Sequence, residues 1–187
     1  LLLSQYITPS TRVMFHRQIT ERVLRIAPFL HLDHDPYLVV ADGRLVWLID
    51  AYTRSDNFPY SQPVAEGFNY VRNSVKITVD AYDGAVNFYL ARPDDPIIQS
   101  YHRALPGLFQ PLEEMPAALQ AHIRYPEDLF EVQTRQYLLY HMTDEQVFYN
   151  QEDRWEIPRE LLENSQEQPM EPYYVFFRLP GEEETEY

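Results

Sequence analysis

Two histidines and two aspartates lie within five positions in the run HLDHD at 31–35. Imidazole nitrogens and carboxylate oxygens are ligands for zinc and iron, and a short loop can supply both kinds. The same run is also typical of a polar loop that leads into a strand, because Asp33 or Asp35 can accept hydrogen bonds from neighbouring backbone amides. We favour the loop interpretation and therefore predict no bound transition metal at His31 and His34.

A second group of titratable residues comprises His122, Glu127, Asp128 and His141. If two helices pack antiparallel, these side chains can converge, and a histidine beside a carboxylate can perform general acid–base catalysis. The alternative is structural, because Glu127 and Asp128 suit the positive end of a helix and His122 suits an exposed helix end. These four residues are the candidate catalytic residues, and the sequence leaves open whether the protein is an enzyme.

Several motifs of catalysis and cofactor binding are absent from the sequence. The chain has no cysteine, so disulfides, thiolate-bound zinc and iron–sulfur clusters are excluded. It has only five glycines, from which a phosphate-binding loop is hard to build. The patterns G-x-S-x-G, H-E-x-x-H and G-x-G-x-x-G do not occur, nor do the P-loop and the calcium-binding loop. We predict no cofactor and no cofactor-binding residue.

The overall charge limits the classes of partner. The chain carries 29 acidic and 15 basic residues, for a net charge of −14. This charge repels phosphate backbones and anionic lipid surfaces, so we predict no nucleic-acid partner. The 15 tyrosines allow two interpretations. They can be core residues whose hydroxyl lies at the edge of the core, or they can line a groove for a sugar or a peptide.

Two Asp-Gly pairs predict the sheet that must position these residues. Apolar runs at 37–41 and 44–50 flank Asp42-Gly43, and runs at 73–82 and 85–91 flank the second pair, Asp83-Gly84. Asp-Gly between such runs is a strong signal for a tight hairpin turn. The sequence therefore predicts one antiparallel sheet built from two hairpins. The connection at 53–70, rich in turn-forming and aromatic residues, is predicted to be a long loop that has a function.

Helical patterns surround this sheet. Residues 8–27 are predicted to form a helix with Thr8 as its cap and Pro9 in its first turn. Its apolar face is predicted to consist of Phe15, Ile19, Val23 and Ile26.

A longer helical segment is predicted over 96–150. Prolines open its helices at 97–109, 117–124 and 127–142. Thr143 and Gln146 form a capping-box pattern for a short last helix. The fold class is therefore predicted to be α+β.

The C-terminal part of the sequence reads as a polar loop over 151–172 and a strand over 172–179. No partner for that strand is visible, so we expect it to join the edge of the sheet or to pair with a second molecule. The chain opens on three leucines without a methionine and ends on GEEETEY. We expect residues 1–187 to be a single α+β part of a larger protein, with the final hairpin from 172 incomplete.

Long blocks of the sequence carry a resemblance to a known family. They are ERVLRIAPFL, DPYLVVADGRLVWLIDAYT, FNYVRNSVKITVDAYDG, RYPEDLF and YHMTDEQVFYNQEDRWEIP. The sequence resembles uncharacterised protein family 0182, most clearly over 21–158. The resemblance implies a large bacterial integral membrane protein with several N-terminal membrane spans and a long soluble region on the outer side. The family has no established activity, so the resemblance supplies no catalytic residue.

The resemblance also bears on the histidine-rich run. The family pattern there is aspartate, any residue, Asp-Pro-Tyr, which Asp33 and the run 35–37 match. His31 and His34 lie outside the pattern, which weakens the metal interpretation.

The combined expectation is a protein of unknown function that lies in the cell membrane as a multi-pass protein, with this chain extracytoplasmic. We expect a cell-envelope binding or interaction module, centred on the aromatic loop 52–70. Its partner would be an envelope protein or a glycan, and the lipid bilayer would be contacted only by spans outside this chain. The alternatives are an envelope hydrolase using carboxylate and histidine chemistry near Glu127 and His141, and a purely structural domain. The oligomeric state stays open.

Overall fold

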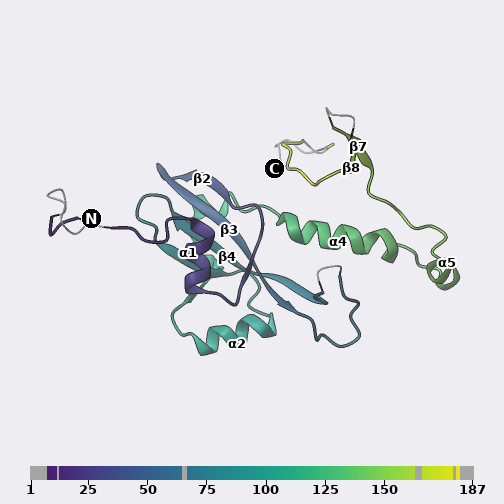
Figure 1. The fold of residues 1–187 in the computed structure, drawn as a ribbon, viewed down its shortest axis with the longest axis horizontal. Helices are drawn as coiled ribbons and strands as arrows, with labels where there is room; N and C mark the ends of the chain where they lie inside the picture. The colour runs from purple at the N-terminus through teal and green to yellow at the C-terminus, as the bar shows by residue number, and fades with distance from the viewer. Residues whose placement is uncertain (1–7, 12, 65–66, 163–165, 179, 182–187) are drawn as a thin grey trace.

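The computed structural model describes residues 8–11, 13–64, 67–162, 166–178 and 180–181. In this part of the chain a six-stranded sheet forms the centre, with helices against it and beside it (Figure 1). The fold is therefore α+β, as the sequence predicts. The strands are β1 (His31–Leu32), β2 (Tyr37–Ala41), β3 (Arg44–Ser55), β4 (Tyr70–Asp80), β5 (Val86–Leu90) and β6 (Phe109–Pro111).

The strand order is β1-β3-β4-β5-β6, and β2 also pairs with β3. Strands β2, β3, β4 and β5 are joined by antiparallel pairing, which confirms the sheet predicted from the two Asp-Gly pairs. The sequence did not predict β1 or the parallel strand β6. Both strands are very short, so their assignment depends on pairing with a neighbour and not on a run of strand-forming residues.

The first Asp-Gly pair forms a tight turn. Ala41 pairs with Arg44, so only Asp42 and Gly43 lie between the strands β2 and β3. Their φ angles are +50° and +73°. Positive φ at both positions is the geometry of a type I′ turn, whose twist matches that of the flanking strands. The prediction of a tight hairpin is confirmed here.

The second Asp-Gly pair lies in a wider connection than predicted. Strand β4 ends at Asp80 and β5 begins at Val86, and Gly84 has a φ of +71°. The Asp80 carboxylate accepts hydrogen bonds from the backbone amides of Tyr82 at 2.8 Å and Asp83 at 3.1 Å. These bonds fold residues directly after Asp80 into a local turn, which ends the strand before the Asp-Gly pair.

One face of the sheet is covered by α1 (Ile19–Ile26) and α2 (Pro96–Ala104). The predicted helix at 8–27 is wrong in its first half, because α1 begins only after Gln18, whose side chain accepts from the Glu21 amide. Phe15 is 72% exposed, so it does not belong to a buried helix face although its sequence spacing from Ile19 and Val23 fits one. The buried residues of this core are Val23, Ala27, Leu30, Ile49, Ala51, Val75, Ile77, Val79, Phe88, Ile98 and Phe109.

The predicted helix at 97–109 also ends early, because α2 stops at Ala104 and Phe109 enters β6 beside Phe88. The other face of the sheet is covered by the 3₁₀ turn η1 (Leu112–Glu114) and by α3 (Ala117–Gln120). The second cluster of buried residues comprises Ala41, Val46, Tyr89, Met115 and Leu119. Because both faces are covered, β3 and β4 are buried along most of their length.

The remaining elements lie beside the sheet (Figure 1). The helix α4 (Glu127–Tyr140) begins where the sequence predicts. The helix α5 (Glu145–Asn150) is capped by Asp144, whose carboxylate accepts from two backbone amides, and not by the predicted Thr143. In the region expected to be loop, β7 (Arg159–Leu161) and β8 (Glu167–Pro169) pair antiparallel. No helix in the described ranges is long and apolar enough to span a membrane.

The segment 172–178, which we call the C-terminal segment, does not belong to either sheet, and Phe177 forms a single β-bridge. The predicted strand there is therefore not an edge strand of the main sheet within the part of the chain described. The last residue of the predicted strand, Leu179, lies outside the described residues. The three leucines at the start of the chain and residues 182–187 also lie outside them.

Candidate functional site

The helix α4 is the central element of the candidate site. Pro126 precedes it, and Glu127 and Asp128 in its first turn are favoured by the positive end of the helix. All residues of α4 are described, and none is buried. A helix with no buried residue has apolar side chains on its surface, and a ligand can bind against them.

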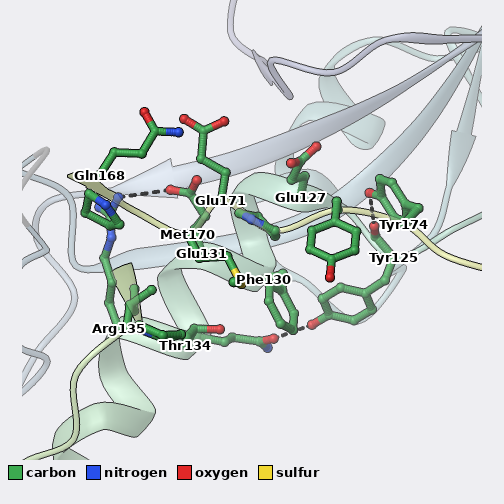
Figure 2. Close-up of a pocket in the computed structure, with 16 residues that line it drawn as sticks. Tyr125, Glu127, Phe130, Glu131, Thr134, Arg135, Gln168, Met170, Glu171 and Tyr174 are labelled. Carbon is green, nitrogen blue, oxygen red and sulfur yellow. Dashed lines mark hydrogen bonds and ion pairs between the residues drawn. The ribbon is translucent and has the colours of Figure 1, made fainter. Parts of the chain in front are cut away.

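A groove runs along one flank of α4. It lies between α4 and residues 157–158 and 168–174, and its volume is about 1030 Å³. Figure 2 shows Phe130 of α4 and Met170 of the C-terminal part among the side chains around this space. The described residues that line the groove are Tyr125, Glu127, Phe130, Glu131, Gln133, Thr134, Arg135, Ile157, Pro158, Gln168, Pro169, Met170, Glu171, Pro172, Tyr173 and Tyr174.

The groove combines apolar walls with acidic groups. Its described lining contains three carboxylates, of Glu127, Glu131 and Glu171, and one guanidinium, of Arg135. Glu131 and Arg135 form an ion pair at 2.9 Å, one helical turn apart. Burial raises the pKa of Glu127 above its ordinary value, and nearby aspartates add to this effect. The groove therefore carries net negative charge next to apolar and aromatic side chains.

The opposite flank of α4 faces the loop between β3 and β4. A smaller hollow of about 220 Å³ lies there, and Tyr140 donates a hydrogen bond to Gln62 at 3.1 Å. Within the loop, Phe58 stacks on Tyr70 with ring centroids 5.0 Å apart, and Phe68 is only 7% exposed. The loop therefore uses part of its aromatic surface for its own packing, and the larger groove lies elsewhere.

Asp33 is a buried anchor point between the sheet and α4. Its side chain accepts hydrogen bonds from the Tyr52 hydroxyl, from the Asp35 amide at 3.0 Å and from the Asp128 amide at 3.2 Å. The last bond satisfies a backbone donor in the first turn of α4, where no partner exists within the helix. The predicted role of Asp33 as an acceptor for a neighbouring backbone amide is confirmed by the bond from Asp35. The bond from the Asp128 amide, 95 positions away, was not predicted.

His34 joins the same cluster from the surface. Its Nδ1 lies in hydrogen-bond contact with Asp128, and its Nε2 is 3.9 Å from the Glu127 carboxylate. Partial burial lowers the pKa of His34, but the hydrogen bond and charge of Asp128, with the charges of Asp33 and Glu127, outweigh burial and raise it. His34 and the first turn of α4 therefore attract each other more strongly when the imidazole is protonated.

The cluster also has the geometry of a cation site. Asp33, His34 and Asp128 each offer one ligand atom, and these atoms lie within 4.8 Å of one another. A divalent cation fits such a set of ligands. However, the Asp33 carboxylate already accepts the hydrogen bonds described above, and His34 is already paired with Asp128. The expected absence of a metal at His31 and His34 remains a prediction.

Arg124 connects the C-terminal segment to the sheet. Its guanidinium pairs with the Asp35 carboxylate and lies over two tyrosine rings, 3.8 Å from that of Tyr37 and 4.0 Å from that of Tyr174. The Tyr174 hydroxyl in turn donates to the backbone carbonyl of Tyr125. A buried guanidinium between two aromatic faces is a favourable cation–π arrangement. This contact, which we call the arginine clamp, holds one end of the groove.

The four candidate catalytic residues are not all brought together. Glu127 and Asp128 meet His34 at the start of α4, whereas His141 lies at its other end, stacked on Trp155 with ring centroids 3.9 Å apart. The 14 residues of α4 span about 20 Å.

His122 contributes its backbone carbonyl, which accepts from the Tyr37 hydroxyl at 3.2 Å. Sequence reasoning missed Arg124, and only its place directly before the Tyr-Pro that precedes α4 offered a signal.

Comparison with known proteins gives the family. All residues from 1 to 187 match the Uncharacterised protein family (UPF0182). A UPF0182 protein of Pelotomaculum thermopropionicum is 51% identical over 187 residues, covering 100% of this chain and 20% of that protein. A UPF0182 protein of Cupriavidus necator is 55% identical over 192 residues, again over 100% of this chain and 21% of the relative.

A UPF0182 protein of Microcystis aeruginosa is 53% identical over 192 residues, covering 100% of this chain and 20% of the relative. The chain thus spans about a fifth of the length of these curated relatives. No solved structure matches it. The family match over the full chain and the identity above one half together show that this chain belongs to the uncharacterised protein family UPF0182.

Proposed function

We propose that this chain is a polypeptide-binding module in the extracytoplasmic part of a multi-pass membrane protein. The observation that carries the binding role is the groove between α4 and residues 157–158 and 168–174, with its volume of about 1030 Å³. Binding sites in proteins are mostly apolar concave surfaces with a few polar groups that orient the ligand, and this groove has that composition.

Charge favours a polypeptide over a glycan as the ligand. The carboxylates of Glu127, Glu131 and Glu171 border apolar side chains, and only Arg135 among the described lining residues brings a positive charge. A peptide that alternates basic and apolar side chains matches both features, because its lysines meet carboxylates while its apolar groups leave water. A neutral glycan can donate hydroxyl hydrogen bonds to these carboxylates but does not neutralise their charge, and an anionic glycan is repelled.

The hydrolase alternative has less support from the geometry. A carboxylate–histidine mechanism needs both groups within reach of one substrate atom. His141 lies at the far end of α4 from Glu127, and of the four candidate residues only Glu127 lines the groove. His34 does approach Glu127, but its ring is paired with Asp128 on the sheet side of the helix.

The extracytoplasmic location rests on the resemblance to membrane proteins with a long outer region. It can be tested in intact cells by placing a cysteine in this part of the protein, which has none of its own. Tyr149→Cys in the full-length protein introduces a thiol at a site that is 86% exposed. A membrane-impermeant maleimide should label this variant in intact cells and leave the parent protein at its background level. Labelling only after lysis would contradict the proposed location.

The binding role is tested with a short synthetic peptide in which lysine alternates with leucine and phenylalanine. Full-length protein should bind it, and Phe130→Asp should weaken binding by at least about tenfold, or 1.4 kcal/mol, since an apolar wall is lost. Tyr149→Asp, outside the groove, is the matched control and should leave the affinity unchanged. Equal affinity of the Phe130 variant, or equal binding of a peptide with glutamate in place of lysine, would refute the proposal.

A further inference from the structure

The smaller hollow beside α4 differs from the groove in its chemistry. Its volume is about 220 Å³, and it lies between α4 and the loop that joins β3 to β4. Among the described residues that line it there is no carboxylate, and the only charged side chain is that of Arg72. Its other polar groups include the side-chain amides of Gln62, Asn69, Gln133 and Gln136. Such a lining suits an uncharged polar ligand.

The loop side of the hollow is held in place by its own hydrogen bonds. The Asn69 side chain accepts from the Phe58 backbone amide at 2.9 Å and donates to the Phe58 carbonyl at 2.8 Å. It also donates to the Ser61 carbonyl at 3.2 Å, and the Ser61 hydroxyl donates to the Asn69 carbonyl at 2.6 Å. A wall that is formed before the ligand arrives loses little conformational freedom on binding.

An aromatic face borders the hollow. Phe58 stacks on Tyr70 with ring centroids 5.0 Å apart, and Tyr70 is only 9% exposed whereas Phe58 is 48% exposed. Because one face of the Phe58 ring lies on Tyr70, the other face is open to a ligand. The face of an aromatic ring is electron-rich, so it attracts the weakly positive C–H groups on the flat side of a sugar ring.

The glutamine side chains have hydrogen-bonding capacity left for a ligand. The Gln62 and Gln133 amide oxygens accept from the hydroxyls of Tyr140 and Tyr125, and neither amide nitrogen donates to another described residue. Gln136 makes no side-chain hydrogen bond within the described ranges. Each amide offers both donors and an acceptor, which is what the hydroxyls of a sugar require, since a hydroxyl also donates and accepts.

We propose that this hollow binds one uncharged pyranose ring of a neutral glycan. Its volume is below the range of about 300–1,000 Å³ that holds a drug-sized ligand, so it suits a single small ring. The free face of Phe58 receives the apolar side of the ring, and the amides receive its hydroxyls. A peptide amide side chain could use the same amides, but it covers less of the aromatic face.

Charge disfavours an acidic sugar in this hollow. The Arg72 guanidinium lies 5.0 Å from the centre of the Tyr70 ring and donates to the Val71 carbonyl at 2.9 Å, so it is already engaged. The net charge of −14 on the chain repels an anionic ligand as a whole. The hollow and the groove therefore favour different ligands on the two flanks of α4.

The test titrates the full-length protein with cellotriose, a neutral chain of glucose rings, and follows binding by ligand-observed NMR. The protein is held in lipid nanodiscs, because glycoside detergents would compete for the site. We expect saturable binding, which Gln136→Ala and Phe58→Ala should each weaken by at least about fivefold. Alanine favours the helix at position 136, so that variant keeps α4. Gln146→Ala, at an exposed glutamine of α5 outside the hollow, is the matched control and should bind like the parent.

Three outcomes overturn the inference. They are the absence of saturable cellotriose binding, an unchanged affinity in Gln136→Ala, and tighter binding of the acidic trigalacturonate than of cellotriose. Phe130→Asp, which alters the groove and not the hollow, should leave the cellotriose affinity unchanged. Failure of this inference is thereby distinguished from failure of the proposed polypeptide-binding role.

Discussion

Asp95 joins two strands and a helix through one buried carboxylate. It is 3% exposed, and its oxygens lie between β3, β4 and the N-terminus of α2. Burial alone raises the pKa of Asp95, but the hydrogen bonds to its carboxylate outweigh burial and lower it. The described donors to it are the hydroxyls of Thr53, Ser74 and Tyr70 and the backbone amides of Ile97 and Ile98.

Replacing Asp95 should be one of the most damaging single changes in the chain. Asp95→Ala removes a helix cap and leaves three buried hydroxyls without their acceptor, so we expect a loss of about 3 kcal/mol in the free energy of unfolding. Urea denaturation at neutral pH measures this loss. Asp94→Ala is the control, because the Asp94 side chain is 77% exposed, and it should change stability by less than about 0.5 kcal/mol. Similar effects of both substitutions would contradict this role.

The pH dependence of Asp95 has a definite sign. Its pKa is lowered in the folded state, so its contribution to stability is present above the ordinary pKa of 3.8 and is lost as the pH falls through the lowered value. The stability difference between the parent chain and Asp95→Asn should therefore be constant near neutral pH and shrink below pH 3.8.

His34 should act in the opposite direction. Burial lowers the pKa of His34, but the hydrogen bond and charge of Asp128 and the charges of Asp33 and Glu127 together outweigh burial and raise it above the ordinary 6.5. Its contribution to stability is therefore present below pH 6.5 and is lost as the pH rises through the raised value. In urea denaturation over a pH series, His34→Gln should be less stable than the parent below pH 6.5, with the difference shrinking at alkaline pH. A difference that does not vary with pH would contradict the role of the His34–Asp128 pair.

At the scale of elements, the two Asp-Gly turns differ in what surrounds the glycine. Gly43 has positive φ, and a Cβ placed on it meets nothing within 4 Å. A Cβ on Gly84 would lie 2.8 Å from Cζ of Arg22, whose Nε donates to the Gly84 carbonyl at 2.6 Å. This arginine joins α1 to the β4–β5 connection.

Gly43→Ala should cost about 1 kcal/mol of unfolding free energy, because only backbone strain is involved. Gly84→Ala should cost more, since the Arg22 guanidinium must move away from the new methyl group and give up its hydrogen bond to the Gly84 carbonyl. The Arg22→Ala background lacks this hydrogen bond, so the cost of Gly84→Ala should fall there toward the cost at Gly43. Equal costs of Gly84→Ala in both backgrounds would show that the contact with Arg22 does not matter.

The elements that sequence reasoning predicted are those whose signals are local. Asp42-Gly43 specifies its turn through the φ angles of two residues, and Pro126 with the acidic first turn specifies the start of α4. The predicted start of the first helix was wrong because Phe15 has the spacing of an apolar helix face but is exposed to solvent, so no burial stabilises a helix there. The short strands β1 and β6 depend on pairing with distant neighbours and carry too few residues to show a period.

The site was harder to predict than the fold for the same reason. Glu127 and Asp128 were identified from their chemistry, but their contacts with Asp33 and His34 cross more than ninety positions of sequence. The arginine clamp joins Asp35, Arg124 and Tyr174, which no periodic pattern connects. Such contacts follow from the tertiary packing of α4 against the sheet, which a single sequence does not specify locally.

At the scale of the whole molecule, the chain has two parts with different packing. The six-stranded sheet is covered on both faces by apolar clusters in the described structure, whereas α4, α5 and the β7–β8 pair lie beside it (Figure 1). Helix α4 has no buried residue, so its backbone should open more readily than that of β3 or β4. A ligand in the groove should therefore stabilise α4 more than the sheet.

Hydrogen exchange of the full-length protein, with and without the alternating lysine peptide, tests the binding role most directly. The account predicts that the peptide slows exchange in Glu127–Tyr140 and Glu167–Pro169, the two elements that border the groove, and leaves the β2–β3 hairpin unchanged. The peptide with glutamate in place of lysine should produce no slowing. Unchanged exchange in α4, or slowing that is the same for both peptides, would contradict the claim that this groove is a polypeptide-binding site.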